Sequence, residues 1–443
     1  MDLHSIEKTP AQDGYLFSRG QAWFAFGMTL ALMVFDYVDR QVIVSLFPYL
    51  KAEWNLSDKQ LGALVSVVSV TVALGALPVA LFADRVSRVK SIVAMATVWS
   101  LATISCMWTR GYGQLLAARA VVGLGEAGYG SVGAALIASH FPARMRGALM
   151  AGFFASASVG SVLGVMLGGM IAERWGWQAA FGVVGVPGLL VALAYLKVRD
   201  YRTVSLEPAL DAKRRSIGEA VRHIVRVLAR TRTMLWVCLG GAAQLIVVSA
   251  LWSWLPSFLN RVHGVAPAQA GVKAALVVLA GALGSVVWGT LVDRVGVRHP
   301  RRKLVTMAVL CVLSMVLLVT AFGTSLAPPA QFALIAIGGF VATCTVGPVS
   351  AIVIDVIHPG VRATGASVLA LFQNLFGLAA GPFVAGLLSD AWGLVPALTV
   401  IPLCALLAAG ACLMAARSYE SDKARAAEPL APEPATAMRS ALA

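Results

Sequence analysis

Long apolar segments separated by short polar stretches make up most of the chain. Each segment is long enough to cross about 30 Å of hydrocarbon as a helix that rises about 1.5 Å per residue. Because 59% of the residues are hydrophobic and only 13% are charged, a soluble fold would expose too much apolar surface to water. We therefore expect an all-α, multi-pass membrane protein with twelve transmembrane helices, over residues 21–46, 59–82, 91–108, 113–139, 147–171, 177–197, 233–259, 270–292, 303–323, 330–355, 364–388 and 394–416.

Lysine and arginine are distributed unevenly between the two sides that these spans define. If the N-terminus is cytoplasmic, the cytoplasmic stretches carry 27 basic residues and the outer stretches carry 6. Basic residues concentrate on the cytoplasmic side of membrane proteins, so both termini are predicted to be cytoplasmic. The same distribution accounts for the net charge of +14 through anionic lipids, without nucleic acid. The abundance of arginine and alanine is typical of a bacterial chain, and we expect the bacterial inner membrane.

The chain repeats short motifs at a spacing of about half its length. The matching positions, which are 209, 217 and 216 residues apart, are 83–86 with 292–295, 173–176 with 390–393, and Gly123 with Gly339. An even number of spans separates the copies, so two parallel six-helix bundles are predicted. Halves related in this way rock against each other around a site near the membrane midplane.

Five parts are predicted along the chain: a cytoplasmic N-tail (1–20), an N-terminal bundle (21–198), a linker (199–232), a C-terminal bundle (233–416) and a cytoplasmic tail (417–443). In the linker, Ile217, Val221, Ile224 and Leu228 form one apolar helical face among arginines, which favours an amphipathic helix on the membrane surface. The tail is rich in Ala, Pro and Glu and is predicted to be disordered.

Several classes of site are disfavoured by the sequence. The six cysteines lie inside apolar segments without paired spacing, so we expect no disulfide, metal or other cofactor. The motifs G-x-S-x-G, H-E-x-x-H and the P-loop lysine are absent from the sequence, which argues against an enzyme. Gly123, Gly125 and Gly128 match a dinucleotide-binding pattern, but they lie inside a span, where they favour close helix packing.

Charged residues inside spans are the strongest functional signal. Arg119 and Glu126 are seven residues apart, and therefore lie on one face of a helix. Asp36 and Arg40 are four apart and can form an ion pair, with Asp39 one residue before Arg40. Each charge within a span costs roughly 2.5–3.5 kcal/mol on insertion scales. The charges therefore either serve transport or form a static ion-pair network between the first and fourth spans.

These five residues comprise three carboxylates and two guanidinium groups, which leaves one carboxylate in excess. Desolvation disfavours a charged carboxylate and a nearby guanidinium favours it, so a cavity that opens and closes would change proton affinity. We expect Glu126 to carry a proton, with Asp39 and Asp36 as further candidates, and Arg119 to set its affinity. Arg40 and Arg119 cannot deprotonate and are candidates for binding an anionic substrate.

Other substrate-binding candidates are polar or aromatic residues within the spans: Tyr37, Tyr129, Gln244, Trp252, Phe372, Gln373 and Asn374. A cavity with charges in one half and an apolar wall in the other suits an amphipathic solute, although each residue is also compatible with packing. His140, Asp355 and His358 are predicted to lie on the cytoplasmic surface.

The stretch after the second span resembles a loop of the major facilitator superfamily, G-x-x-x-D-R-x-G-R-[RK]. Asp84, Arg85 and Arg88 match it, and Asp293 and Arg294 match it in the second copy. The resemblance implies a twelve-helix transporter in which these five residues act in conformational gating, by holding the outward-open state.

Within this superfamily, the chain is similar to the Spinster branch at Asp36-Tyr-Val-Asp-Arg40, at Arg119 with Glu126, and at 254–264. That resemblance implies a proton-coupled secondary transporter of an amphipathic or anionic molecule such as a lysophospholipid. The organic-anion branch shares the Asp-Arg ending of the first span and Gly-Trp after the fifth, which implies a symporter of aromatic or sugar acids. A non-transporting membrane sensor is a third alternative. The partners expected are a small molecule, protons and lipids, around a monomer.

Overall fold

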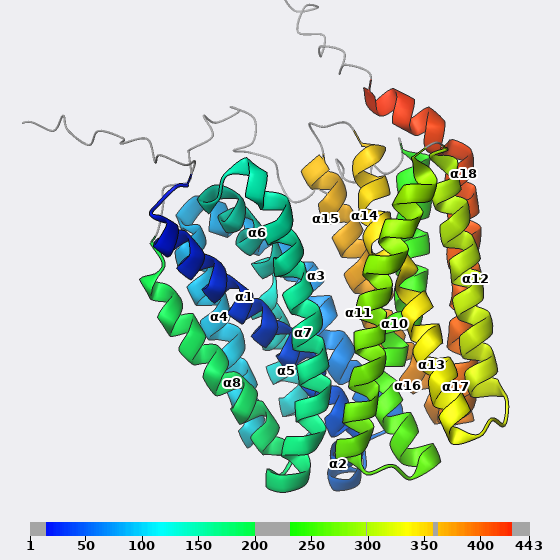
Figure 1. Ribbon diagram of the computed structural model, residues 1–443. Coiled ribbons are helices and arrows are strands. Elements are labelled where there is room, and N and C mark those ends of the chain that lie inside the picture. The colour runs from blue at the N-terminus through cyan, green and yellow to red at the C-terminus, as the bar shows by residue number, and fades with distance from the viewer. Residues whose placement is uncertain (1–14, 200–230, 298, 358–361, 428–443) are drawn as a thin grey trace, which may run out of the picture.

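The computed structural model describes residues 15–199, 231–297, 299–357 and 362–427 (Figure 1). Within these ranges the chain is helical and contains no strand. The N-terminal half comprises α1 (Arg19–Val42), η1 (Ile43–Leu46), α2 (Phe47–Trp54), α3 (Asp58–Val86), α4 (Arg88–Ser105), η2 (Cys106–Trp108), α5 (Tyr112–Glu126), α6 (Tyr129–His140), α7 (Ala143–Trp175), α8 (Trp177–Ala194) and η3 (Tyr195–Lys197).

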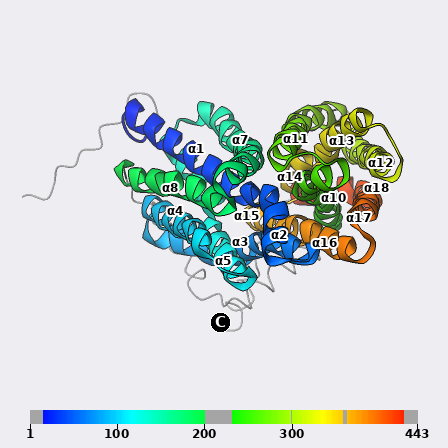
Figure 2. The same ribbon diagram turned by 90° about the horizontal axis from the view of Figure 1, so that it is seen from below.

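The C-terminal half follows the same order of spans. It comprises α10 (Arg232–His263), α11 (Pro267–Gly296), α12 (Arg301–Gly323), α13 (Pro328–Ala342), η5 (Thr343–Thr345), α14 (Val346–Asp355), α15 (Arg362–Phe372), η7 (Gln373–Ala379), α16 (Ala380–Trp392), α17 (Leu394–Val400), η8 (Ile401–Leu403) and α18 (Cys404–Ala427). Figure 2 shows the two bundles side by side.

The predicted all-α membrane fold is confirmed. Among the described residues, eleven spans are long and apolar enough to cross a membrane, and α1, which carries four charged residues, is the twelfth. The fourth span is broken between α5 and α6, because Gly128 has a φ of +85°, in the left-handed region that favours glycine. The eleventh span contains a π-helix, η7.

The predicted internal repeat is also confirmed by packing. Gly123 of α5 lies against Val68 of α3, and Gly339 of α13 lies against Val277 of α11. Val68 and Val277 are themselves 209 residues apart, as the repeat requires. Absence of a side chain at these glycines lets the paired helices approach closely in both halves.

The two described ends of the chain lie at the same end of the molecule, at the top of Figure 1. We call this the terminal end, and the opposite end, where α2 lies, the far end. Two seams join the halves near the far end, one between α3 and α16 and one between α7 and α11. In the first, Gly62 and Gly386 lie against the backbone of the opposite helix, and in the second Gly169 and Gly271 do.

One predicted boundary is wrong. The disordered tail was expected from residue 417, but α18 continues through Ala427. Its last turns pack on the bundle: Asp422 is buried and accepts a hydrogen bond from the backbone nitrogen of Thr233 at 2.8 Å, and Tyr419 donates to Asp355 at 2.9 Å. Polar composition alone did not reveal that these residues are anchored. Most of the linker, 200–230, lies outside the described residues.

Candidate functional site

The last turns of α1 and the length of α5 bring the five charged residues of the N-terminal half together. Asp36, Asp39, Arg119 and Glu126 are buried, and the Arg40 side chain is 17% exposed. Asp36, Asp39 and Arg40 lie on neighbouring turns of α1, because residues three and four apart share a helix face. The five charged residues therefore lie together, and the ion pairs among them determine which groups are left to bind a proton or an anion.

Asp39 and Arg119 form one balanced pair. The Arg119 Nη1 group donates to the Asp39 carboxylate Oδ1 at 3.2 Å and to the Asp39 carbonyl oxygen at 3.2 Å. The other carboxylate oxygen of Asp39 accepts a hydrogen bond from the Thr103 hydroxyl at 2.6 Å. Both oxygens of Asp39 are therefore satisfied. Thr103 comes from α4 and was not predicted, because a single threonine in an apolar helix does not stand out by composition or spacing.

Arg40 is shared by the other two carboxylates. Its Nε atom lies 3.0 Å from Asp36 Oδ1 and 3.0 Å from Glu126 Oε2. The guanidinium also lies over the ring of Tyr37, 5.2 Å from its centroid. The predicted pair of Asp36 with Arg40 is confirmed, and its Nε–H bond is directed at Asp36.

Arg119 is predicted to set the proton affinity of Glu126, but in this conformation the ion-pair partner of Glu126 is Arg40. Residues seven apart share a helix face but are separated by about 10.5 Å along the axis. Arg119 therefore reaches Asp39, while Glu126 reaches Arg40 one residue further along α1. The two helices are therefore joined by two ion pairs at different levels, Arg119 with Asp39 and Glu126 with Arg40.

Glu126 is the last residue of α5, directly before the break at Gly128. The end of α5 is held against α4, because Gly125 packs on the backbone of Trp99 without room for a side chain. A carboxylate at a helix C-terminus faces the negative end of the helix dipole, which disfavours its charge. Both burial and the position at the helix C-terminus therefore disfavour the charged form of Glu126.

Several polar atoms of the cluster have no hydrogen-bond partner within the described ranges. They are Nε and Nη2 of Arg119 and both carboxylate oxygens of Glu126, of which Oε2 has only the ion-pair contact with Arg40. Nearly all buried polar groups in proteins are hydrogen-bonded, so such groups call for an explanation. Proton binding at Glu126 and anion binding at the free edge of Arg119 are two chemical uses of these atoms.

The aromatic and polar candidates fall into two groups. Tyr129 is fully buried and donates its hydroxyl hydrogen to the Thr29 carbonyl at 2.6 Å, so it belongs to the core of the N-terminal half. Gln244 is likewise buried, and donates to Ser314 at 3.1 Å and to the Ala342 carbonyl at 3.0 Å. These two residues hold helices together within their own halves.

The remaining candidates of the C-terminal half are partly accessible. Trp252, Phe372, Gln373 and Asn374 are half-buried. Gln373 and Asn374 begin the π-helix η7, and single-turn π-helices are frequent at functional sites. Asn374 donates to the Ala370 carbonyl at 2.9 Å. These four uncharged side chains are therefore partly accessible for contact with a substrate.

The gating candidates are placed only in part. The side chains of Asp84 and Arg85 lie outside the described residues. Arg88 donates to the Ser139 hydroxyl at 3.2 Å, which ties α4 to α6. In the second copy Asp293 pairs with Lys303 at 2.9 Å, and Arg294 is exposed.

Three residues, His140, Asp355 and His358, were predicted to lie on the cytoplasmic surface. His140 was expected on the surface, but it is buried and its Nδ1 lies 2.9 Å from the Leu136 carbonyl. Aromatic packing explains the burial, because Phe17 lies 5.4 Å from its ring. Asp355 is half-buried and accepts from Tyr419. His358 lies outside the described residues.

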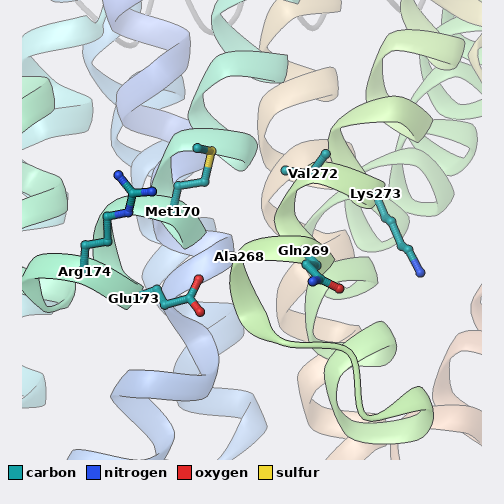
Figure 3. Close-up of a pocket in the computed structure, with 7 residues that line it drawn as sticks. All are labelled: Met170, Glu173, Arg174, Ala268, Gln269, Val272 and Lys273. Atoms are coloured by element: carbon teal, nitrogen blue, oxygen red, sulfur yellow. The ribbon is translucent and has the colours of Figure 1, made fainter.

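A cleft of about 440 Å³ lies between α7 and α11 at the far end (Figure 3). Its lining residues are Met170, Glu173, Arg174, Ala268, Gln269, Val272 and Lys273. None of them belongs to the predicted substrate-binding set. The cleft is therefore separate from the charged cluster of α1 and α5.

The sequence profile of the Major Facilitator Superfamily matches residues 29–380 and also 237–442. The chain belongs to the Major Facilitator Superfamily. Members of this family are transporters, so this multi-pass membrane protein is a transporter and not an enzyme.

Relatives of this superfamily member include proteins of both predicted branches. An MFS-type efflux pump of Mycolicibacterium smegmatis is 28% identical, over 84% of this chain and 85% of its own length. Protein spinster homolog 3 of Danio rerio is 26% identical, over 84% and 78%. A gallate transporter of Pseudomonas putida is 27% identical, over 88% and 91%.

Among solved structures, a bacterial homologue of the human lysosomal transporter Spinster, in an inward-facing and unoccupied conformation, superposes with a TM-score of 0.81. It is 22% identical, and the match covers 94% of this chain and 100% of that one. The Spinster-like fold predicted from sequence is thus confirmed.

Proposed function

We propose that this protein is a proton-coupled secondary transporter that moves an amphipathic or anionic small molecule, such as a lysophospholipid, by alternating access. The observation that carries the proposal is the sharing of Arg40 by two buried carboxylates, Asp36 and Glu126. It acts as a monomer in the bacterial inner membrane, with both termini in the cytoplasm and with membrane lipids around it.

Charge balance identifies where the proton binds. Asp39 and Arg119 neutralise each other, with Thr103 completing the bonds to Asp39. The group of Asp36, Arg40 and Glu126 retains one excess negative charge. Burying a net charge in a membrane protein is costly, so uptake of one proton by the two carboxylates around Arg40 makes the group neutral. We assign this proton to Glu126, because the Arg40 Nε–H bond is directed at Asp36 and the Glu126 oxygens accept no hydrogen bond among the described residues, although Oε2 is in ion-pair contact with Arg40.

Release of the proton is linked to conformation. If the halves move so that water reaches Glu126, the charged carboxylate is hydrated and the proton is lost. If the cluster is shielded again, Glu126 must take up a proton or find a new cation. The proton affinity of one residue therefore alternates with the direction in which the transporter opens, as coupling requires.

The contacts between the halves support a particular conformation. Hydrogen bonds from Asp58, Lys59 and Ser66 to α16 or η7 join the halves toward the far end. At the terminal end, contacts such as Lys303 with Asp293 stay within one half. With cytoplasmic termini, these contacts close the transporter on its outer side.

The substrate class follows from the chemistry of the two halves. The free Nε and Nη2 of Arg119 offer a planar pair of donors that suits a carboxylate or phosphate. Trp252 and Phe372 offer apolar contacts on the other half. An anion with an apolar body matches both, and lysophospholipids have this form.

An organic-anion symporter is the second candidate, and the likeness to a gallate transporter favours it. Aromatic acids also combine an anion with an apolar body, but they are much smaller. A non-transporting sensor on the same frame is the third candidate, and it predicts ligand binding without flux.

Flux measurements on the purified protein in proteoliposomes test the proposal. We expect uptake of a lysophosphatidylglycerol or of a gallate-like acid to be accelerated by a pH gradient, and exchange at equal pH to continue without one. Preference for the lysolipid supports the first candidate and preference for the acid supports the second. Binding of either ligand without any flux would assign the protein to the sensor class, and flux that ignores the pH gradient would refute proton coupling.

A further inference from the structure

Asp58, the first residue of α3, accepts hydrogen bonds from residues of both halves at the far end. It is 3% exposed. Arg261 of α10 donates to both of its carboxylate oxygens, at 2.7 and 2.9 Å. Lys51 donates to Oδ1 at 2.5 Å and Ser389 of α16 donates to Oδ2 at 2.5 Å. Three donors from three segments thus converge on one buried carboxylate.

A second carboxylate strengthens the same seam. Asp390, next to Ser389 on α16, accepts hydrogen bonds from the backbone nitrogens of Asp58 and Lys59, at 2.8 and 2.9 Å. It therefore satisfies free N–H groups at the start of a helix that belongs to the other half, where a negative charge is favoured by the helix dipole. Arg261 and Asp390 bind the N-terminal half from two different helices of the C-terminal half.

The internal repeat supplies a matched comparison in the seam between α7 and α11. Its close contacts are equivalent to those between α3 and α16. Gly386 lies against the Asp58 carbonyl, and Gly169, which is 217 residues earlier, lies against the Pro267 carbonyl. Pro267 in turn is 209 residues after Asp58, as the repeat predicts. The backbone packing of the two seams is therefore conserved between the copies.

The polar residues are not repeated. Asp58 is replaced by Pro267, which has neither a carboxylate nor a backbone N–H, and Ser389 is replaced by Ala172. The counterpart of Asp390 is Glu173, but no hydrogen bond or ion pair of Glu173 links it to α11 within the described ranges, and α11 has no side-chain cap.

The cleft of Figure 3 occupies this second seam. Glu173 projects from α7 toward α11, whereas Arg174 and Lys273 point away on opposite sides (Figure 3). The cations are therefore not gathered around a ligand position. The seam between α7 and α11 is packed through its glycines. A cleft lies at the position where the seam between α3 and α16 has polar contacts.

We propose that Asp58, Lys51, Arg261, Ser389 and Asp390 form a far-end latch, which sets how often the transporter opens at this end, while the seam of α7 and α11 contributes no comparable polar restraint. The latch must break whenever the far end opens, because its members lie on opposite halves. This role holds whichever side of the membrane the far end faces, and it does not depend on proton coupling.

Distances between spin labels at the far end measure this opening. Cysteines for labelling replace Arg110 and Ser325, exposed residues on opposite halves, in a chain whose six native cysteines are replaced. The protein is reconstituted in lipid nanodiscs for pulsed electron-spin measurements. In Asp58→Asn we expect the ratio of long to short distances to rise about tenfold or more, because removing one charge of a buried pair leaves its partners uncompensated.

Ser389→Ala removes one donor with little change in volume, so it should shift the same ratio in the same direction by a smaller factor. If Asp58→Asn does not fold, Ser389→Ala and Arg261→Gln, each made as a single variant, test the latch instead. Asp390→Asn and Glu173→Gln form a matched pair at equivalent positions of the repeat. The first should favour opening and the second should leave the distances unchanged. Unchanged distances in all folded latch variants, or an equal shift in Glu173→Gln, would overturn the proposal.

Discussion

The interiors of the two halves are stabilised by different chemistry. In the N-terminal half, α1 and α5 bury two carboxylates around Arg40 and a third beside Arg119. In the C-terminal half, the buried Gln244 bonds to Ser314 and to a backbone carbonyl. The repeat preserves the helix packing but not the polar residues. Under the proposed function, proton chemistry is confined to the N-terminal half, and the C-terminal half supplies packing and an apolar wall.

The same lesson applies to the seams, where the fold provides equivalent backbone contacts and only one copy adds polar bonds. A duplicated bundle thus separates two tasks. Glycine contacts set how closely the helices approach in both seams, and we propose that the polar residues around Asp58 restrict opening in one of them. The predictions that follow test whether the two interiors really differ in this way.

Arg119→Ala should have the largest effect. It removes the cation from Asp39 and leaves a buried carboxylate with only Thr103 as a donor, which costs about 3–5 kcal/mol. Folding yield, exchange and pH-driven transport should all fall. Unfolding in mixed detergent micelles measures the loss of stability, and Arg119→Lys, which keeps the charge, should recover part of it. Wild-type stability in Arg119→Ala would mean that the pair with Asp39 contributes little.

Thr103→Val should have an intermediate effect. It removes a hydroxyl donor to a buried carboxylate, which costs about 2 kcal/mol of stability. Exchange should slow, but the response to a pH gradient should remain, since the change leaves Arg40, Asp36 and Glu126 intact. Thr103→Ser is the control that keeps the hydroxyl. Loss of pH coupling in Thr103→Val with normal exchange would move the proton site to Asp39.

Gln244→Leu should have the smallest effect. It replaces a buried polar side chain of the C-terminal half by an apolar one of similar size, and such exchanges change stability by about 1 kcal/mol. The pH dependence of transport should match that of the wild type. A large change in coupling would show that the C-terminal half takes part in proton chemistry, and would remove the contrast between the halves.

Much of the fold could be predicted from the sequence, because apolar runs, the position of basic residues and repeated motifs are local signals. The five charges were also recognisable, since ionisable residues are rare within spans. The pair of Asp36 with Arg40 within one helix was also predictable, but the pairs between α1 and α5 were not. The pairing of Glu126 with Arg40 depends on how two helices lie side by side.

Residues such as Thr103 and Asp58 could not be assigned from sequence. Asp58 follows Ser57, whose capping box with Gln60 marks the start of a helix, so its local role was readable. Its functional partners are 203 and 331 residues away along the chain. Neither composition nor periodicity connects residues at such separations, and only the fold brings them together.

Transport by Glu126→Gln in proteoliposomes tests the central claim most directly, with pH-driven uptake and counterflow at equal pH measured on the same vesicles. Glutamine keeps the size of the side chain and cannot change its charge. We expect pH-driven accumulation to be lost while counterflow continues, because exchange needs no net proton movement. Asp39→Asn should differ, since it leaves Arg119 buried without its carboxylate and impairs both activities. Full pH-driven accumulation by Glu126→Gln would contradict the account and leave the pair of Arg40 and Glu126 with a structural role alone.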